Sequence, residues 1–215
     1  MTFRKVLITP GFILMLSVFY YFDRSGMLAL SILASLIHEA GHYAAVRAFG
    51  GKIDALTLSV TGADMALSGS SLGYVSEAVC ALAGPAASFI GAIVSSAAGK
   101  LTGLDEAFAL SGICVIQGAL NLLPSSHLDG GRAIYLLILR SRGHQTAEKL
   151  ILITGLASAL MISTAGLLTL LRTGYNYSLL AAGTWLFLSG LRRDPAAEPI
   201  KRTIGTSRLA GRPTA

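Results

Sequence analysis

The chain has 215 residues, of which 53% are hydrophobic and 13% are charged, and its mean hydropathy is +0.65. This composition excludes an ordinary soluble domain, and two cysteines inside apolar runs exclude a disulfide framework. The formal net charge of +6 does not indicate nucleic-acid binding, because the lysine and arginine residues lie between or beyond the apolar runs.

Six apolar runs, taken in chain order, are predicted to be transmembrane helices. A helix that spans a bilayer needs about 20 apolar residues, with a range of roughly 17–25. The runs lie at about 6–22, 27–49, 74–99, 106–123, 149–171 and 174–191. The first run is longer than a signal-peptide core and no small-residue cleavage site follows it, so we expect it to be retained. Residues 1–191 are therefore predicted to form one α-helical, polytopic membrane domain with about six transmembrane helices.

The connections contain two shorter elements. Between the second and third spans, the segment GGKIDALTLSVTGADMALSGSS alternates apolar and polar residues around glycines, which predicts a small β-hairpin. Its backbone groups would go unpaired in bare lipid, so we expect this membrane-associated hairpin at the interface or beside a cavity. After the fourth span, the apolar run 133–139 is too short to cross and predicts a membrane-surface or re-entrant helix.

The positive charges predict the orientation of the spans. With the N-terminus in the cytoplasm, 14 of the Lys and Arg residues lie on the cytoplasmic side, and only Arg24, Lys100 and Arg172 lie outside. Because cytoplasmic loops carry the excess of Lys and Arg, both termini are predicted to be cytoplasmic. The segment 192–215 is basic, has few large apolar residues, and is predicted to be a disordered cytoplasmic tail.

The second span contains three ionisable residues in the sequence HEAGH, namely His38, Glu39 and His42. Each ionisable group in a span costs at least about 2.5–3.5 kcal/mol, so its presence suggests a function. Residues four apart project from one face of a helix, so both histidines can bind the same zinc ion. Glu39 is placed to take a proton from a water molecule at the metal. The alternative, that the histidines are hydrogen-bonded packing residues, is disfavoured by the combined insertion cost.

A catalytic zinc site usually has three protein ligands and one open position. The best candidate for the third ligand is Asp129, because Pro124 ends the fourth span and two glycines after Asp129 allow a sharp turn. Asp129 could instead cap the short helix that follows it. His127 is a rival third ligand, although a supporting or interfacial role fits it better.

Three motifs together resemble the site-2 protease family of intramembrane zinc metalloproteases. They are HEAGH at 38–42, AGPAAS at 83–88 and NLLPSSHLDGGR at 121–132, and their form is closest to the bacterial sporulation branch, which processes sigma-factor precursors. The resemblance implies that His38, His42 and Asp129 bind one zinc ion and that Glu39 is the general base. It also implies that Asn121 orients or polarises the substrate peptide, and that the hairpin pairs with an unwound substrate segment by strand addition.

The chain departs from the family pattern at two positions. The motif with Gly84 and Pro85 usually continues to an Asn, where this chain has Ser88. The position two residues before the motif's Asp is often Pro, and here it is His127. The chain also shows no PDZ or CBS domain, which many members carry.

These observations predict a zinc metalloprotease of a bacterial inner or plasma membrane that acts in regulated intramembrane proteolysis. Its substrate would be a membrane-tethered protein, such as a transcription factor or its anti-factor, cut within or near a transmembrane segment. The partners expected are this substrate and the lipid bilayer, and not nucleic acid. The alternative is a non-proteolytic zinc-binding membrane protein, either a metal transporter or a sensor. A pseudoprotease is disfavoured by the intact ligands and base. The sequence alone does not identify substrate-binding residues.

Overall fold

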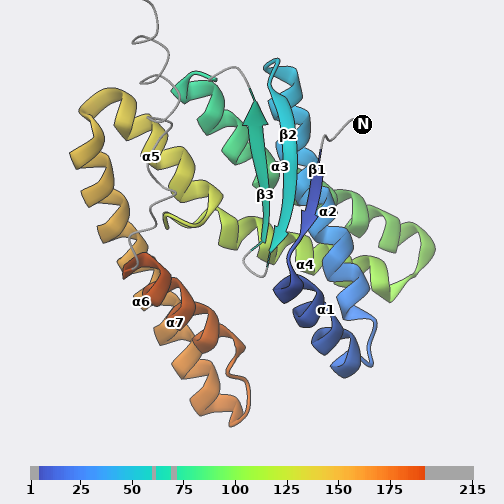
Figure 1. Ribbon diagram of the computed structural model, residues 1–215. Helices are drawn as coiled ribbons and strands as arrows, with labels where there is room; N and C mark the ends of the chain where they lie inside the picture. The colour runs from blue at the N-terminus through green and yellow to red at the C-terminus, as the bar shows by residue number, and fades with distance from the viewer. Residues whose placement is uncertain (1–4, 60–61, 69–71, 192–215) are drawn as a thin grey trace, which may run out of the picture.

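The computed structural model describes residues 5–59, 62–68 and 72–191, and the predicted tail at 192–215 lies outside this range. The described chain is mainly helical, with one small sheet near its N-terminal half (Figure 1). The strands are β1 (Lys5–Ile8), β2 (Lys52–Ser59) and β3 (Gly62–Ser68). The helices are α1 (Pro10–Phe22), α2 (Met27–Ala48), α3 (Tyr74–Thr102), α4 (Asp105–Asn121), α5 (Asp129–Arg142), α6 (His144–Thr173) and α7 (Ser178–Leu191).

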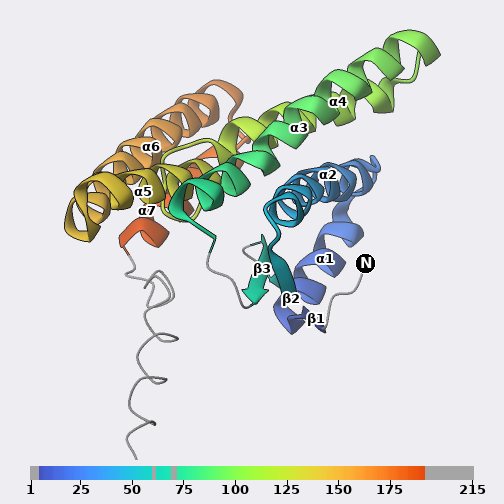
Figure 2. The same ribbon diagram turned by 90° about the horizontal axis from the view of Figure 1, so that it is seen from above.

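Helix α3 is the central element of the fold. It packs against α2, α4 and α5, and α5 in turn packs against α6, which pairs with α7. In both views α6 and α7 lie on one side of the molecule, and α1, α2 and the sheet lie on the other (Figures 1 and 2). Helices α2 and α5 both pack against α3, so α3 sets how residues of α2 and α5 lie relative to each other.

The predicted hairpin is present, and it carries an additional strand. β2 and β3 pair antiparallel, and β1 pairs in parallel with the other side of β2, with Lys5 opposite Ala55 and Ile8 opposite Leu58. The first predicted span therefore begins too early, because residues 5–8 are a strand and the helix begins at Pro10. Thr9 ends the strand and caps the helix, its side chain accepting a hydrogen bond from the Phe12 N–H at 3.3 Å.

Small residues allow the helices to pack closely. On α2, a side chain at Gly41 would overlap the Ala83 carbonyl and lie 2.5 Å from the Ala87 Cβ of α3. Large apolar side chains instead face outward, including Ile90, Ile93, Leu101, Leu160 and Leu171, which are between 62% and 88% exposed. Apolar outer faces around a core of small residues are typical of helices packed in a membrane.

Two described helices, α3 and α6, are long and apolar enough to cross a membrane by themselves. The apolar helices α1 and α7 have 13 and 14 residues and are shorter than a span. The short helix predicted around 133–139 is part of α5, which has 14 residues. The helical segments were thus predicted close to their observed places, while the number that cross the membrane stays a prediction.

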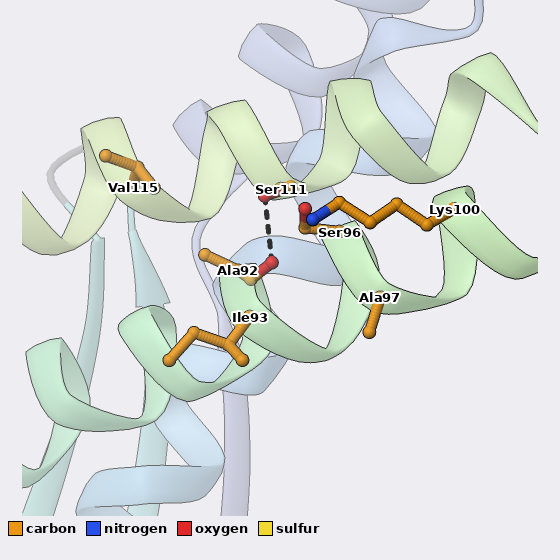
Figure 3. A pocket seen from close by; sticks show the side chains of 7 residues that line it. All are labelled: Ala92, Ile93, Ser96, Ala97, Lys100, Ser111 and Val115. Atoms are coloured by element: carbon orange, nitrogen blue, oxygen red, sulfur yellow. Dashed lines mark hydrogen bonds between the residues drawn. The ribbon is translucent and has the colours of Figure 1, made fainter.

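A shallow groove of about 370 Å³ runs between α3 and α4 (Figure 3). The Ser111 hydroxyl donates a hydrogen bond of 2.8 Å across it to the Ala92 carbonyl, and the Lys100 side chain lies along it. None of the ionisable residues of the HEAGH motif lines this groove.

Candidate metal centre

Three side chains from two helices converge beside α3. His38 and His42 lie one turn apart on α2, and Asp129 is the first residue of α5. The Asp129 Oδ2 atom lies 3.0 Å from the His38 Nε2 atom and 3.2 Å from the His42 Nε2 atom, and the two Nε2 atoms are 3.1 Å apart. Among the described residues, this trio is the group of histidine, cysteine and acidic side chains that could hold a metal ion.

The connection between α4 and α5 brings Asp129 to this place. After α4 ends at Asn121, the chain turns through Pro124 and returns against itself at the start of α5. A side chain at Gly130 would overlap the Leu122 carbonyl, and one at Gly131 would overlap the Ser125 carbonyl. The two glycines therefore let the turn close tightly, which fixes the direction in which α5 begins. The predicted alternative of a helix cap is wrong, because Leu128 occupies the N-cap position and Asp129 lies within the helix.

Helix α3 contributes the partners of both imidazole rings. The His42 Nδ1–H donates to the Cys80 carbonyl at 2.8 Å, and the His38 Nδ1 atom lies 2.9 Å from the Ser88 hydroxyl. A side chain at Gly84 would overlap the His42 ring, so the glycine makes room for it. Pro85 lies inside α3 and has no N–H, so the Ala81 carbonyl, next to the Cys80 carbonyl that His42 uses, has no helical donor from position 85.

The donor set fits a zinc ion. Zinc in proteins takes imidazole nitrogen and carboxylate oxygen at about 2.0–2.2 Å, and ligand atoms at about 2.0–2.1 Å in a tetrahedron lie about 3.3–3.4 Å apart. The three observed separations, 3.0–3.2 Å, are close to that value. With the Nδ1 atoms donating, each neutral ring presents a lone pair at Nε2, so three acceptor atoms face one another. Such an arrangement is repulsive unless a cation lies between the atoms.

Because the three side chains are largely buried, a bound cation would stabilise them more than it would on the surface. The side chain of His38 is 5% exposed, that of His42 is 16% exposed and that of Asp129 is 20% exposed. Water screens charges poorly at such depth, so a carboxylate and two imidazoles are costly unless each is paired or coordinated. His42 and Asp129 are slightly more exposed than His38, so they lie nearer the surface of the molecule.

Glu39 and Asn121, the predicted catalytic residues, lie near this cluster in the chain. Glu39 is half-buried on α2, directly after His38. Asn121 is the last residue of α4, and its amide donates to the Gln117 carbonyl at 3.0 Å. That bond fixes the orientation of the side chain at the turn that leads to Asp129.

His127, the rival third ligand, faces away from the cluster. Its Nε2 atom lies 3.0 Å from the Ser189 carbonyl of α7, and its ring centroid is 6.2 Å from that of Trp185. Asp129 therefore lies with the two histidines, whereas His127 connects the α4–α5 segment to α7 through its contacts with Ser189 and Trp185.

Sequence reasoning did not identify the residues of α3 that hold the rings. In the sequence, Ser88 is visible only as a departure from a family pattern, and Cys80 only as one of two cysteines inside apolar runs. The signal available was general: each ligating histidine needs a partner for its second nitrogen. Which residues supply that partner depends on the packing of α2 on α3, which spacing along the chain does not reveal.

Comparisons with known proteins found relatives in sequence and in structure, although no family model matches the chain. It is 30% identical over 191 residues to a protein of Mycobacterium tuberculosis named zinc metalloprotease Rip3, covering 84% of this chain and 47% of Rip3. It is 26% identical over 146 residues to a zinc metalloprotease of Methanocaldococcus jannaschii, covering 66% of this chain and 42% of that protein. The chain thus spans about half the length of the curated relatives it matches.

Among solved structures, the chain is similar to a site-2 protease from Methanocaldococcus jannaschii. The TM-score is 0.66 at 23% identity, over 88% of this chain and 91% of the other. At this identity the match shows a shared fold, which includes nearly the whole of both chains.

Proposed function

We propose that this chain, which resembles the site-2 protease family in both sequence and fold, is an intramembrane zinc metalloprotease. It would hydrolyse a peptide bond within or near a transmembrane segment of a membrane-tethered protein. The observation that carries the proposal is the convergence of two imidazole Nε2 atoms and a carboxylate oxygen at 3.0–3.2 Å, with a glutamate next to one of the histidines.

In the proposed site, His38, His42 and Asp129 would hold one zinc ion. A bound zinc ion would act as a Lewis acid, which lowers the pKa of water enough for it to lose a proton near neutral pH. Glu39, one residue from a ligand, takes the proton from the attacking water and later passes it to the leaving amine. Asn121, held by its bond to the Gln117 carbonyl, orients the scissile peptide and stabilises the charge that develops on its oxygen.

A transmembrane helix must be unwound before its peptide bonds can react, and the sheet offers a way to hold the unwound segment. β2 is paired on both sides, with β1 and with β3, so the open edge of the hairpin is that of β3. An extended substrate segment would pair its backbone with this edge. The hairpin packs on the ends of α2 and α3 through a cluster of Val46, Ile53 and Cys80, and Cys80 also binds His42, so the edge is coupled to the site.

The setting proposed for this reaction is a bacterial cell membrane. The apolar outer faces of the helices and the two helices of spanning length support a membrane location. The distribution of Lys and Arg supports cytoplasmic termini and a multi-pass topology. The substrate proposed is a membrane-tethered transcription factor or its anti-factor, released by regulated intramembrane proteolysis.

The decisive experiment compares wild type with Glu39→Gln during co-expression with tagged, single-span transcription factors and anti-factors. We expect wild type to release a soluble fragment and Glu39→Gln to release at least about 100-fold less, while the zinc content of the purified proteins stays equal. Glu106→Gln, at an exposed glutamate in the first turn of α4, is the matched control and should cleave normally. Cleavage by Glu39→Gln at the wild-type rate, or zinc transport into vesicles without cleavage, would favour the non-proteolytic alternative.

The ligand assignment has its own test. Asp129→Ala should lower the zinc content of the purified protein strongly, because it removes one of three ligands. His127→Ala should leave zinc content unchanged, because its ring contacts Ser189 and Trp185 on α7. Elemental analysis of both variants after dialysis measures the difference. An equal loss of zinc in the two variants would contradict the assignment of Asp129.

A further inference from the structure

Ser88 occupies an unusual position for a hydroxyl group. It lies on α3, has an exposed fraction of 0%, and reaches across to another helix to contact the His38 Nδ1 atom at 2.9 Å. Its hydroxyl donates to the Gly84 carbonyl, one turn earlier in its own helix, at 3.2 Å. A buried hydroxyl with two partners and no access to water has a defined orientation.

This geometry selects one form of the His38 ring. A hydroxyl has one proton, and the Ser88 proton is given to the Gly84 carbonyl. With that proton on the Gly84 carbonyl, the contact with His38 is one in which the ring Nδ1–H donates and the Ser88 oxygen accepts. In a neutral imidazole a proton on Nδ1 leaves the lone pair on Nε2, which is the atom that faces Asp129 and His42.

We propose that Ser88 is a positioning residue that holds His38 in the tautomer and ring orientation needed to bind the metal. The proposal rests on the proposed function only in taking the three-residue cluster as a zinc site. With the Cys80 carbonyl doing the same for His42, α3 orients both histidines although it supplies no ligand of its own. Of these two supports, the one from Ser88 is a side chain and can be removed by substitution.

The packing around Ser88 explains why a small residue stands where an Asn is usual in the family. A side chain at Gly118 of α4 would lie 3.2 Å from the Ser88 Cβ, closer than ordinary contact, so α4 lies directly against this position. Ser88 is also among the largest fully buried side chains of the described chain. A serine is fully buried at this close contact and still reaches the ring.

The test measures zinc affinity by chelator competition in the purified, full-length protein. Ser88→Ala should lower the affinity about 10–100-fold, the usual effect of removing a group that orients a metal ligand. Ser88→Cys exchanges one atom, the hydroxyl oxygen, for a larger sulfur that is only a weak hydrogen-bonding group, so it should behave like Ser88→Ala. Ser95→Ala, at another buried serine of α3, is the matched control and should bind zinc like wild type.

Two further measurements distinguish a positioning role of Ser88 from a general loss of structure in the variants. The thermal midpoint of the metal-free Ser88→Cys protein should stay close to wild type, because one atom is exchanged and no cavity is left. Nitrogen-15 NMR of the metal-free wild type should show His38 protonated at Nδ1, and the Cys variant should show a mixture of tautomers.

Each outcome decides between the hypotheses. Wild-type affinity in Ser88→Ala, full recovery in Ser88→Cys, or an Nδ1 proton retained in both would overturn the positioning role and leave the proposed function intact. If wild type itself bound no zinc, the proposed function would be wrong, and the role of Ser88 would be wrong with it.

Discussion

Helices α1 and α3 are both apolar, yet they relate to the rest of the molecule in opposite ways. None of the residues of α1 is buried, and large side chains such as Leu14 and Phe22 are 67% and 74% exposed. α3 buries many residues, all of them small: Ala78, Cys80, Ala81, Gly84, Pro85, Ser88, Gly91, Ala92, Ser95 and Gly99. Overall hydrophobicity therefore does not identify the helix that organises the site, whereas side-chain size does.

The difference follows from what drives packing in a membrane. Lipid is as apolar as leucine, so burying a large apolar side chain against a neighbour gains little there. Close approach of backbones gains van der Waals contact and lets polar groups reach across between helices. On α3, small residues permit the Ser88 hydroxyl and the Cys80 carbonyl to reach the two histidines of α2.

The largest effect should come from enlarging the residue that faces a ligand. Gly84→Ala would place a Cβ 2.5 Å from the His42 Cε1 atom and 2.7 Å from Cδ2, so the ring must leave its bond with the Cys80 carbonyl. We expect zinc affinity to fall at least about 100-fold, the upper end of the effect of losing an orienting partner. Chelator competition in the purified protein measures this change.

The matched control is Gly112→Ala on α4, where a new Cβ would meet nothing within 4 Å. It should bind zinc normally and gain up to about 1 kcal/mol in helix stability, because Ala is the better helix former. Equal zinc affinity in the two alanine variants would show that close packing on α3 does not position His42.

The same comparison shows how far the sequence predicts the fold. α2 was expected at about 27–49 and is observed at Met27–Ala48, because Gly26 and the glycines after Phe49 mark both ends of its apolar run. β1 was missed because Val6, Leu7 and Ile8 suit a helix or a strand equally well within an apolar run. Its strand partner, β2, lies far along the chain, and only Thr9 and Pro10 signalled that the helix begins later.

The residues of the candidate site also fall into those that the sequence predicts and those that it does not. The grouping of His38 with His42 follows from helix periodicity, and Asp129 was found because proline and glycines predict a sharp turn at that point. The supports on α3 could not be predicted, since Ser88 and Cys80 are ordinary residues for a packed helix. Their roles come from the register of α2 against α3, which is fixed by close contacts such as that of Gly41 with Ala87.

The smallest expected effects are on the free energy of unfolding, and they should differ between substitutions in α3 and in α1. Ala78 of α3 is 2% exposed and packs against Ala81, Ala133 and Leu136 at the contact with α5. Ala78→Leu would overfill this contact and should lower the free energy of unfolding by about 1–3 kcal/mol. Leu14→Ala on α1 removes a side chain that is 67% exposed and should change the free energy of unfolding by less than about 0.5 kcal/mol.

Both free energies can be measured by denaturant titration in the same mild detergent, with zinc removed so that metal binding does not contribute. If Leu14→Ala proved as destabilising as Ala78→Leu, α1 would have to pack against a surface that the described chain does not show. If Ala78→Leu were tolerated, the contact between α3 and α5 would be loose. The approach of Asp129, the first residue of α5, to the two histidines would then need another cause.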